Sequence, residues 1–381
     1  MDRLCPGCEN RIVIPWASPL AQYRAHEKEI QAAIMRVLES GAYILGDEVE
    51  SFERALANFC GVPHAIGVGS GTDALIVALR ALAIGPGHEV ITVSHTAVAT
   101  VAAILATGAT PVLVDVDPTY YTIDPARIED AITPRSKAIV AVHLYGQAAD
   151  MDAIAALGKR RGLRVVEDCA QAAGGRYRDR RIGSLSDIAC FSFYPTKNLG
   201  GIGDGGMVVA ADAELAARVR RLRQYGWDEA RQTREIGLNS RLDPLQAAIL
   251  RAKLPYLDTD NARRAAIAKR YDQGFAGLPL NAPAVRPKTI HTFHLYVIAC
   301  DDRAGLMAHL ADQRIGSAVH YPVPVHRQNG YVEWAVVPTS GLPVTSKLVD
   351  RILSLPIYPE FSDDDVDRVI ACIRSYFGAS Q

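Results

Sequence analysis

Apolar residues follow two kinds of pattern along the chain, and the two alternate up to about residue 225. Short runs that are apolar almost throughout predict strands at 64–68, 89–93, 111–116, 138–144, 164–167, 188–193 and 206–210. Apolar residues three or four positions apart predict helices, as in 30–38, 49–59 and 75–82. Because the strand runs do not alternate with polar residues, we expect strands buried on both faces, in a parallel sheet between helices.

The pattern changes beyond residue 225. A polar stretch predicts a long loop at 227–241, and helical spacing returns at 245–253 and 262–275. The C-terminal part mixes a strand at 293–299 with helices at 304–313 and 363–376. We therefore expect three parts, which are an N-terminal tail at 1–13, a large α/β domain at 14–254 and a smaller α+β domain at 255–381.

Composition narrows the classes of protein that this chain can be. It has 381 residues, is 49% hydrophobic, and balances 41 basic against 42 acidic residues, so we expect neither nucleic acid nor an anionic membrane as partner. No apolar run is long enough for a transmembrane helix, and no signal peptide is evident. The 7 scattered cysteines predict no disulfide framework and a reducing, cytoplasmic location. Cys5 and Cys8 have half the spacing of a zinc site, and no second pair completes it, so we expect no metal.

Two charged residues at the ends of predicted strands indicate a particular chemistry. Lys197 follows the strand at 188–193 and precedes a glycine-rich turn at 200–206, and Asp168 follows the strand at 164–167. A lysine near a carboxylate is the pair that pyridoxal phosphate (PLP) requires. The lysine bonds to the cofactor, and the aspartate keeps the pyridine nitrogen protonated so that the ring accepts electrons. A lone lysine is usually a solvated surface charge, so the prediction depends on the pair.

Small residues between the first predicted strand and the next helix predict a phosphate site. Gly71 and Thr72 would let a ligand approach the amides of the first helical turn. Ser192, at the end of another predicted strand, would add a hydroxyl. The alternative is a tight turn in which Ser70 or Thr72 caps the helix and Ser192 bonds to the backbone.

The residues around Asp168 also have a structural explanation. The Asp168 carboxylate could cap a following helix instead of meeting a cofactor. Glu167 should point to the opposite face of the strand, because strand side chains alternate. Gln171, in the turn that follows, could meet the ring hydroxyl of PLP.

Two later segments supply candidates for anion and substrate recognition. Asn239, near the end of the polar loop, could reach an anion, including one bound by a second subunit. The alternative for that segment is a helix start with Asp243 as cap and Pro244 in the first position. The proline-stiffened segment 319–327 carries polar rings suited to substrate recognition, namely His320, Tyr321 and His326.

Taken together, these segments resemble the DegT/DnrJ/EryC1/StrS family, the sugar-nucleotide aminotransferases of PLP fold type I. The resemblance extends from about Ile14 to the C-terminus, with motifs in order at 70–75, 167–172, 192–206, 239–248 and 320–326. It implies a large domain with a mostly parallel seven-stranded sheet and a smaller C-terminal α+β domain. It also implies a homodimer whose active sites are shared between subunits.

The resemblance assigns a role to each candidate. Lys197 would bond to PLP and move a proton between the amino acid and the cofactor, while Asp168 pairs with the pyridine nitrogen and Gln171 meets the ring oxygen. The phosphate would be bound by Gly71, Thr72 and Ser192, with Asn239 contributed by the other subunit. The residues expected to bind substrate are Tyr194, His320, Tyr321 and His326.

One position departs from the family pattern. Members often place an aromatic over the cofactor ring in a Thr-aromatic-x-x-Thr sequence, whereas this chain has Ala97 between Thr96 and Thr100. Alanine cannot stack on a ring, so His95 is the candidate cover. Members with histidine in place of the lysine act as dehydratases, and Lys197 argues against that chemistry here.

The resemblance is strongest to enzymes that aminate C3 of dTDP-3-keto-6-deoxyhexoses, and glutamate is the expected amino donor. Enzymes that act at C4 of UDP- or GDP-4-keto sugars share most of the motifs, and a cyclitol or another non-nucleotide ketone is a further alternative. A non-enzymatic PLP-binding regulator is disfavoured because both Lys197 and Asp168 are retained.

Overall fold

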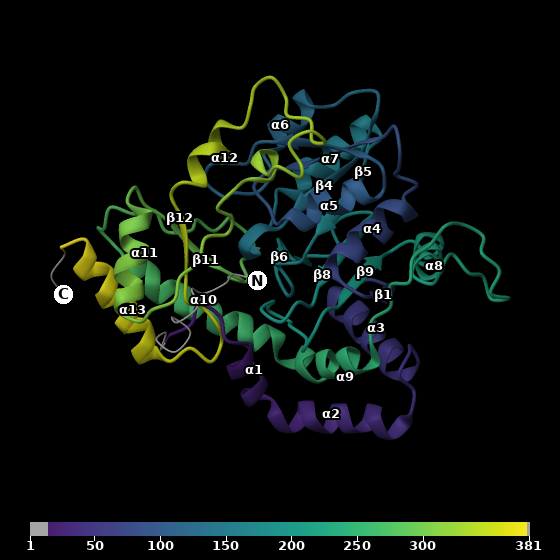
Figure 1. The fold of residues 1–381 in the computed structure, drawn as a ribbon, viewed down its shortest axis with the longest axis horizontal. Helices are drawn as coiled ribbons and strands as arrows, with labels where there is room; N and C mark the ends of the chain where they lie inside the picture. The colour runs from purple at the N-terminus through teal and green to yellow at the C-terminus, as the bar shows by residue number, and fades with distance from the viewer. Residues whose placement is uncertain (1–13, 379–381) are drawn as a thin grey trace.

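A seven-stranded sheet forms the centre of the larger part of the molecule in the computed structural model, which describes residues 14–378 (Figure 1). Its order is β1-β9-β8-β5-β4-β2-β3. The strands are β1 (His64–Val68), β2 (Glu89–Val93), β3 (Thr110–Val114), β4 (Ser136–Val142), β5 (Arg164–Asp168), β8 (Ile188–Ser192) and β9 (Gly206–Ala210). Within this sheet, β9 runs in the direction opposite to all the other strands. The mostly parallel sheet is therefore confirmed. Each predicted run overlaps a strand, and the ends of the strand differ from those of the run by at most two residues.

Helices cover both faces of this sheet. One face packs against α4 (Gly71–Ala81), α5 (Val98–Ala106) and α8 (Ala213–Leu222). The other packs against α3 (Asp47–Cys60), α6 (Pro125–Asp130), α7 (Met151–Arg161) and α9 (Pro244–Lys253). Neighbouring residues of one strand enter different cores, as Val165 and Val166 do, because strand side chains alternate. This explains why the strand runs are apolar throughout.

A second core lies on the left in Figure 1 and is built mainly from the C-terminal part of the chain. It surrounds an antiparallel pair, β11 (Tyr296–Ala299) and β12 (Ile352–Leu355), with α10 (Leu257–Gly274), α11 (Arg303–Asp312) and α13 (Asp363–Tyr376). We keep 14–254 and 255–381 as the proposed division, since α9 ends at Lys253 and α10 begins at Leu257. The predicted tail at 1–13, with Cys5 and Cys8, lies outside the described residues.

The remaining α-helices and strands lie outside the groups named above. They are α1 (Pro19–Ala25), α2 (Glu27–Ser40), β6 (Arg176–Tyr177), β7 (Arg180–Arg181), β10 (Thr289–Ile290) and α12 (Pro343–Leu348). The predicted loop at 227–241 is confirmed, with only isolated bridges inside it. The strand predicted at 293–299 begins only at Tyr296, because Phe293 adopts a left-handed φ of 44° and its amide donates to His291 Nδ1.

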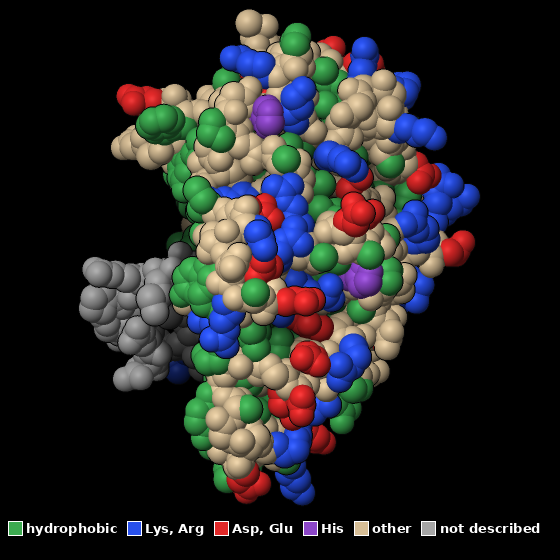
Figure 2. All heavy atoms as spheres, turned by 90° about the vertical axis from the view of Figure 1, so that its right-hand side faces the viewer, with side chains coloured by type: hydrophobic (Ala, Val, Ile, Leu, Met, Phe, Trp, Pro, Cys, Tyr) green, Lys and Arg blue, Asp and Glu red, His purple; other side chains and the backbone are tan. Residues whose placement is uncertain are grey.

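The surface carries charges of both signs. Figure 2 shows Lys and Arg side chains intermixed with Asp and Glu over one face, in keeping with the net charge of −1. Among the described helices, none is long and apolar enough to cross a membrane.

Candidate active site

The sheet topology brings the predicted site residues to one edge. β1 and β8 are both antiparallel to β9, so they run in the same direction as each other and as β5, β4 and β2. The carboxyl ends of these strands therefore lie together, where open α/β sheets bind their ligands. The predicted residues Gly71, His95, Asp168 and Ser192 are at or just beyond those ends.

The predicted phosphate site forms where β1 and β8 meet. Gly206 pairs with both Val68 and Ser192, which brings the two strand ends together. A Cβ atom on Gly71 would lie 2.5 Å from the Ser192 Cβ, so only glycine allows this approach. Ser70 Oγ also accepts from the Asp73 amide at 3.1 Å, so the capping alternative is correct as well.

Asp168 ends β5 on the face covered by α5. Its Oδ2 accepts from Thr100 Oγ1 at 2.8 Å, and its Oδ1 accepts from the Ala170 amide at 3.2 Å. Burial raises the pKa of this carboxyl, although these two bonds and the charge of Lys197 act in the opposite direction. Asp168 is therefore a buried carboxylate near a lysine. The helix-cap alternative is wrong, because a turn and β6 follow Asp168, and the Ala170 bond closes that turn.

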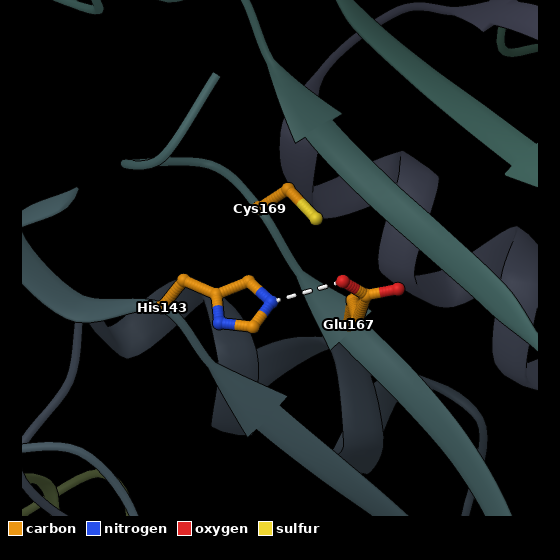
Figure 3. Close-up of side chains that lie close together, drawn as sticks. All are labelled: His143, Glu167 and Cys169. Atoms are coloured by element: carbon orange, nitrogen blue, oxygen red, sulfur yellow. Dashed lines mark hydrogen bonds and ion pairs between the residues drawn. The ribbon is translucent and has the colours of Figure 1, made fainter. Parts of the chain in front are cut away.

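Glu167 points to the opposite face of β5, as predicted. It faces His143, the residue after β4, and His143 Nε2 lies 3.1 Å from Glu167 Oε2 (Figure 3). The Gly183 and Leu185 amides and Ser186 Oγ each donate to the same carboxylate at 2.9 Å. Burial alone would raise the pKa of Glu167, but the bonds from His143, Gly183 and Leu185 outweigh burial and lower it.

Cys169 points into the same space as His143 and Glu167 in Figure 3, and the three ligand atoms lie within 4.8 Å of one another. His143 Nδ1 accepts from the Ala149 amide at 3.1 Å, so both nitrogens of its ring are bonded. Burial, with the nearby charge of Glu167, raises the pKa of the Cys169 thiol well above its usual range. The cluster is explained by its own hydrogen bonds, and it does not suit a thiolate-bound metal.

Lys197 lies in a tight turn after β8. A Cβ atom on Gly200 would lie 2.4 Å from the Pro195 carbonyl oxygen, so the turn requires glycine there. The next side chain, Asn198, fixes the turn to the second core by donating to Asn261 Oδ1 at 2.7 Å and to the Thr292 carbonyl at 2.9 Å. Burial lowers the pKa of Lys197 to about 8, and Asp168 opposes that shift.

A second group of side chains joins the sheet edge to the segment at 319–327. Gln171 Nε2 donates to Tyr321 Oη at 3.0 Å, and Gln171 Oε1 accepts from the Tyr145 amide at 2.6 Å. The Tyr145 hydroxyl donates to the His320 carbonyl and lies 2.8 Å from His95 Nε2. The single proton of the Tyr145 hydroxyl goes to the His320 carbonyl. His95 Nε2 must therefore be the donor in its bond with the Tyr145 oxygen.

The lowered pKa of His95 makes the ring neutral near pH 7, so that Nδ1 is the acceptor nitrogen. Burial lowers its pKa to about 4, and Nδ1 has no hydrogen-bond partner among residues 14–378. Its ring meets Tyr121 and Tyr145 edge-on. Its place as cover of a cofactor ring stays a prediction.

The other predicted residues differ in their surroundings. Tyr194 is 48% exposed. His326 Nδ1 lies 2.7 Å from Ser94 Oγ and so anchors its segment to the end of β2. Asn239 is exposed, and the next residue, Ser240, contacts the phosphate site through the Gly69 amide at 3.0 Å. Asp243 is the residue before α9, with Pro244 next, but its side chain makes no capping bond.

Sequence reasoning missed several residues of the site. Thr100 bonds Asp168, and its hydroxyl is 3.1 Å from that of Thr96. The Thr-x-x-x-Thr spacing was the available signal, although α5 begins only at Val98 and Thr96 precedes it. Nothing local indicated Tyr145, Asn198 or His143, because their contacts join distant parts of the chain.

The described residues fit PLP. A lysine with a lowered pKa, a buried carboxylate and a close approach of glycine to serine at a helix N-terminus lie at one sheet edge. PLP sites use groups of these three kinds, namely a nucleophile, a partner for a protonated ring nitrogen and a phosphate cradle.

Comparison with known proteins agrees with this geometry. A profile of the DegT/DnrJ/EryC1/StrS aminotransferase family matches residues 24–374. The chain belongs to this family.

Similar family members are known in sequence and in structure. The chain is 48% identical over 364 residues to the dTDP-3-amino-3,4,6-trideoxy-alpha-D-glucose transaminase of Streptomyces venezuelae, covering 95% of this chain and 96% of that one. It is 45% identical over 362 residues to the UDP-N-acetyl-3-dehydro-alpha-D-glucosamine 3-aminotransferase of Acidithiobacillus ferrooxidans, covering 94% and 97%. The solved structure of S. venezuelae DesV in complex with a ketimine intermediate matches with a TM-score of 0.94 and 48% identity, covering 97% and 99%.

Proposed function

We propose that this aminotransferase uses PLP to transfer an amino group from glutamate to C3 of a dTDP-linked 3-keto-6-deoxyhexose. The observation that carries the proposal is the convergence of Lys197 and Asp168 beside the Gly71–Ser192 approach. The lysine is close enough to Asp168 for each charge to shift the pKa of the other.

The proposed mechanism assigns separate tasks to these residues. Gly71, Thr72 and Ser192 would hold the phosphate of PLP, and Asp168 would hold the proton of its ring nitrogen. When bound, PLP supplies an electron sink for the carbon that loses its proton. Lys197, whose pKa of about 8 leaves part of its amine neutral near pH 7, is the nucleophile and then carries the proton to and from carbon. Thr100 and the Ala170 amide keep the Asp168 carboxylate oriented.

The choice of C3 and of dTDP rests on the family comparison. The names of the two relatives both specify position 3 of the sugar, but one names dTDP and the other UDP. Position 3 is therefore better supported than the nucleotide. In the structure, Tyr321 reaches Gln171 and the His320 carbonyl is held by Tyr145, so this segment is fixed to the sheet edge and could present its rings to a sugar.

We also propose a homodimer with shared sites and a cytoplasmic location. Apolar side chains that are more than half exposed lie at Tyr43, Ile44, Ile202 and Ile236, and their burial against a second copy would be favourable. Asn239 would then reach the phosphate in the partner's site. The location rests on the cysteines, of which the five described are all free.

Separate half-reactions test the proposal. Conversion of the PLP spectrum by glutamate should occur without sugar. After glutamate and its keto acid are removed, return of the PLP spectrum should require a 3-keto sugar nucleotide. dTDP-, UDP- and GDP-linked sugars with ketones at C3 or C4 should be compared, together with a keto cyclitol. Turnover with C4-keto sugars alone would overturn the C3 assignment, and no reaction with any amino acid would overturn the function.

Shared sites are tested by mixing two inactive variants. Lys197→Ala and Asn239→Asp subunits should regain activity on subunit exchange, because one of the two sites in a heterodimer keeps both native residues. No regain, with exchange shown independently, would contradict the shared site.

A further inference from the structure

The side chain that follows Lys197 is held by a buried group of hydrogen-bonding residues. Asn198 is 4% exposed, and its Nδ2 donates to Asn261 Oδ1 at 2.7 Å and to the Thr292 carbonyl at 2.9 Å. Its Oδ1 lies 3.2 Å from His294 Nδ1. Asn261 is on α10, and residues 292 and 294 precede β11, so the group joins the Lys197 turn to the second core.

Two backbone carbonyls, which can only accept, set the direction of each hydrogen bond in this group. Asn261 Nδ2 donates to the Ala173 carbonyl at 2.9 Å, so Asn261 presents its oxygen to Asn198. The Asn198 nitrogen must therefore face Asn261 Oδ1 and the Thr292 carbonyl. Its oxygen is left for His294, and an amide oxygen only accepts, so His294 carries a proton on Nδ1.

His294 is a neutral ring in the neighbourhood of Lys197. It is 6% exposed, and burial lowers its pKa well below the usual range. The nearby charge of Lys197 acts in the same direction. A neutral imidazole has a single N–H, and in His294 that N–H is the one that meets Asn198.

The turn that Asn198 anchors is short and carries the reacting amine. The Lys197 amide donates to the Tyr194 carbonyl at 2.8 Å, and Gly200 lies against the Pro195 carbonyl. Without a donor at residue 294, Asn198 Oδ1 would be a buried acceptor with no partner, which is costly enough for the amide to turn. The peptide after Lys197 would then move, and a shift of about 1 Å in a reacting group can cost about 100-fold in rate.

We propose that His294 positions the reacting lysine, by donating from Nδ1 to Asn198 and so holding the turn that carries Lys197. The inference rests on the proposed function, because it names the residue that orients the proposed nucleophile. His294 acts through Asn198, so it is a positioning residue. Lys197 moves the proton in both half-reactions, so a misplaced lysine slows both by a similar factor, whereas a residue that binds one substrate affects one of them.

Three variants of His294 separate the Nδ1 bond from the size and polarity of the ring. The side-chain nitrogen of asparagine is attached to Cγ, as histidine Nδ1 is, whereas that of glutamine is one bond further away. His294→Asn should therefore keep the bond to Asn198, and both half-reactions should stay within about threefold of wild type. His294→Gln and His294→Leu lose the bond, and both half-reactions should slow by about 10- to 100-fold.

Stopped-flow absorbance of the PLP-loaded enzyme measures the two half-reactions, with glutamate in one and the keto sugar that the wild type accepts in the other. The apparent affinity for each substrate should stay within about threefold in every His294 variant. His291→Gln is the matched control. His291 is a buried histidine of the same segment, with a pKa lowered to about 3 by burial, but it bonds the Phe293 amide and no described residue of the Lys197 turn. This control should keep both rates.

Thermal unfolding of each variant shows whether it is native at the assay temperature, so that lost stability is not mistaken for a lost rate. If His294→Gln or His294→Leu fails to fold, the other is compared with His294→Asn. Equal rates in His294→Asn and the variants that lack the bond would overturn the inference, as would a loss confined to one half-reaction. A wild-type enzyme that reacts with no amino acid would instead overturn the proposed function.

Discussion

Glu167 and Asp168 are consecutive carboxylates on one buried strand, yet the protein holds them in opposite ways. Glu167 accepts four hydrogen bonds, and its pKa is lowered although it is fully buried. Among residues 14–378, Asp168 accepts bonds only from Thr100 and Ala170, and its pKa is raised by burial. A carboxylate whose lone pairs are filled is part of the fold. A carboxylate with spare acceptor capacity beside a lysine is suited to hold a cationic ring.

The two faces of β5 explain the difference. On the Glu167 side, the 183–186 turn and His143 close around the carboxylate within the main core. On the Asp168 side, the helix α5 supplies one hydroxyl, and the sheet edge stays available to a ligand. Alternation along a single strand thus separates a residue held by the fold from the residue that we propose acts in catalysis.

The largest expected effect is a difference in the free energy of unfolding between a Glu167 variant and an Asp168 variant. Glu167→Gln should lower the free energy of unfolding by about 3–5 kcal/mol, because an amide nitrogen would face buried N–H donors. Asp168→Asn should leave the free energy of unfolding unchanged or raise it. The substitution removes a charge that burial penalises in the folded protein. Urea unfolding at pH 7 measures both, and exposed Glu129→Gln is the control.

Glu167 should also make the free energy of unfolding depend on pH. The folded pKa of Glu167 lies below its usual 4.5, so its contribution is present above that pH and is lost as the pH falls through the folded value. Glu167→Gln should lack this acid-side loss. Equal stability of the two variants at pH 7 would contradict the division of roles.

The next effect is on catalysis. Asp168→Asn should reduce the rate of the glutamate half-reaction by about 10²–10³-fold, because the ring nitrogen loses the charge that keeps its proton. Folded Glu167→Gln, assayed at a temperature where it remains native, should stay within about tenfold of wild type. Stopped-flow absorbance follows both. Near-normal turnover of Asp168→Asn would show that another group protonates the ring.

These contrasts also show what could be predicted from the sequence. The strands, the lysine, the aspartate and the orientation of Glu167 to the opposite face of β5 follow from local apolar runs and from the two-residue period of a strand. The Thr100–Asp168 bond joins residues 68 positions apart, and the His143–Glu167 bond joins neighbouring strands. Such contacts depend on how elements pack against each other, which no local pattern specifies.

A smaller effect concerns the lysine itself. Covalent capture of PLP by the apoenzyme needs a neutral amine, so its rate should rise with pH through a midpoint near 8, the pKa to which burial brings Lys197. Asp168 raises that pKa, so Asp168→Asn should move the midpoint to lower pH. Glu167→Gln should leave it in place. A midpoint near 10.5, the usual value for lysine, would contradict the buried environment.

The smallest expected effect comes from Thr100. Thr100→Val removes one hydrogen bond to Asp168 and keeps the shape of the side chain. The half-reaction should slow by about three- to tenfold, the equivalent of about 1 kcal/mol. Thr107→Val, on the residue just after the same helix, is the control, since its hydroxyl bonds only nearby backbone groups. Equal losses in both variants would point to a general effect on the helix.

The most direct test of the account is where PLP becomes attached. Lys253 is the internal rival, because burial lowers its pKa to about 8 too, but its amine already donates to Gln22 and Gly200. The protein should be loaded with PLP, reduced with borohydride, digested and mapped by mass spectrometry. The account predicts the reduced label on the peptide that contains Lys197, and no label in Lys197→Ala. Label on Lys253 or on any other lysine would contradict it.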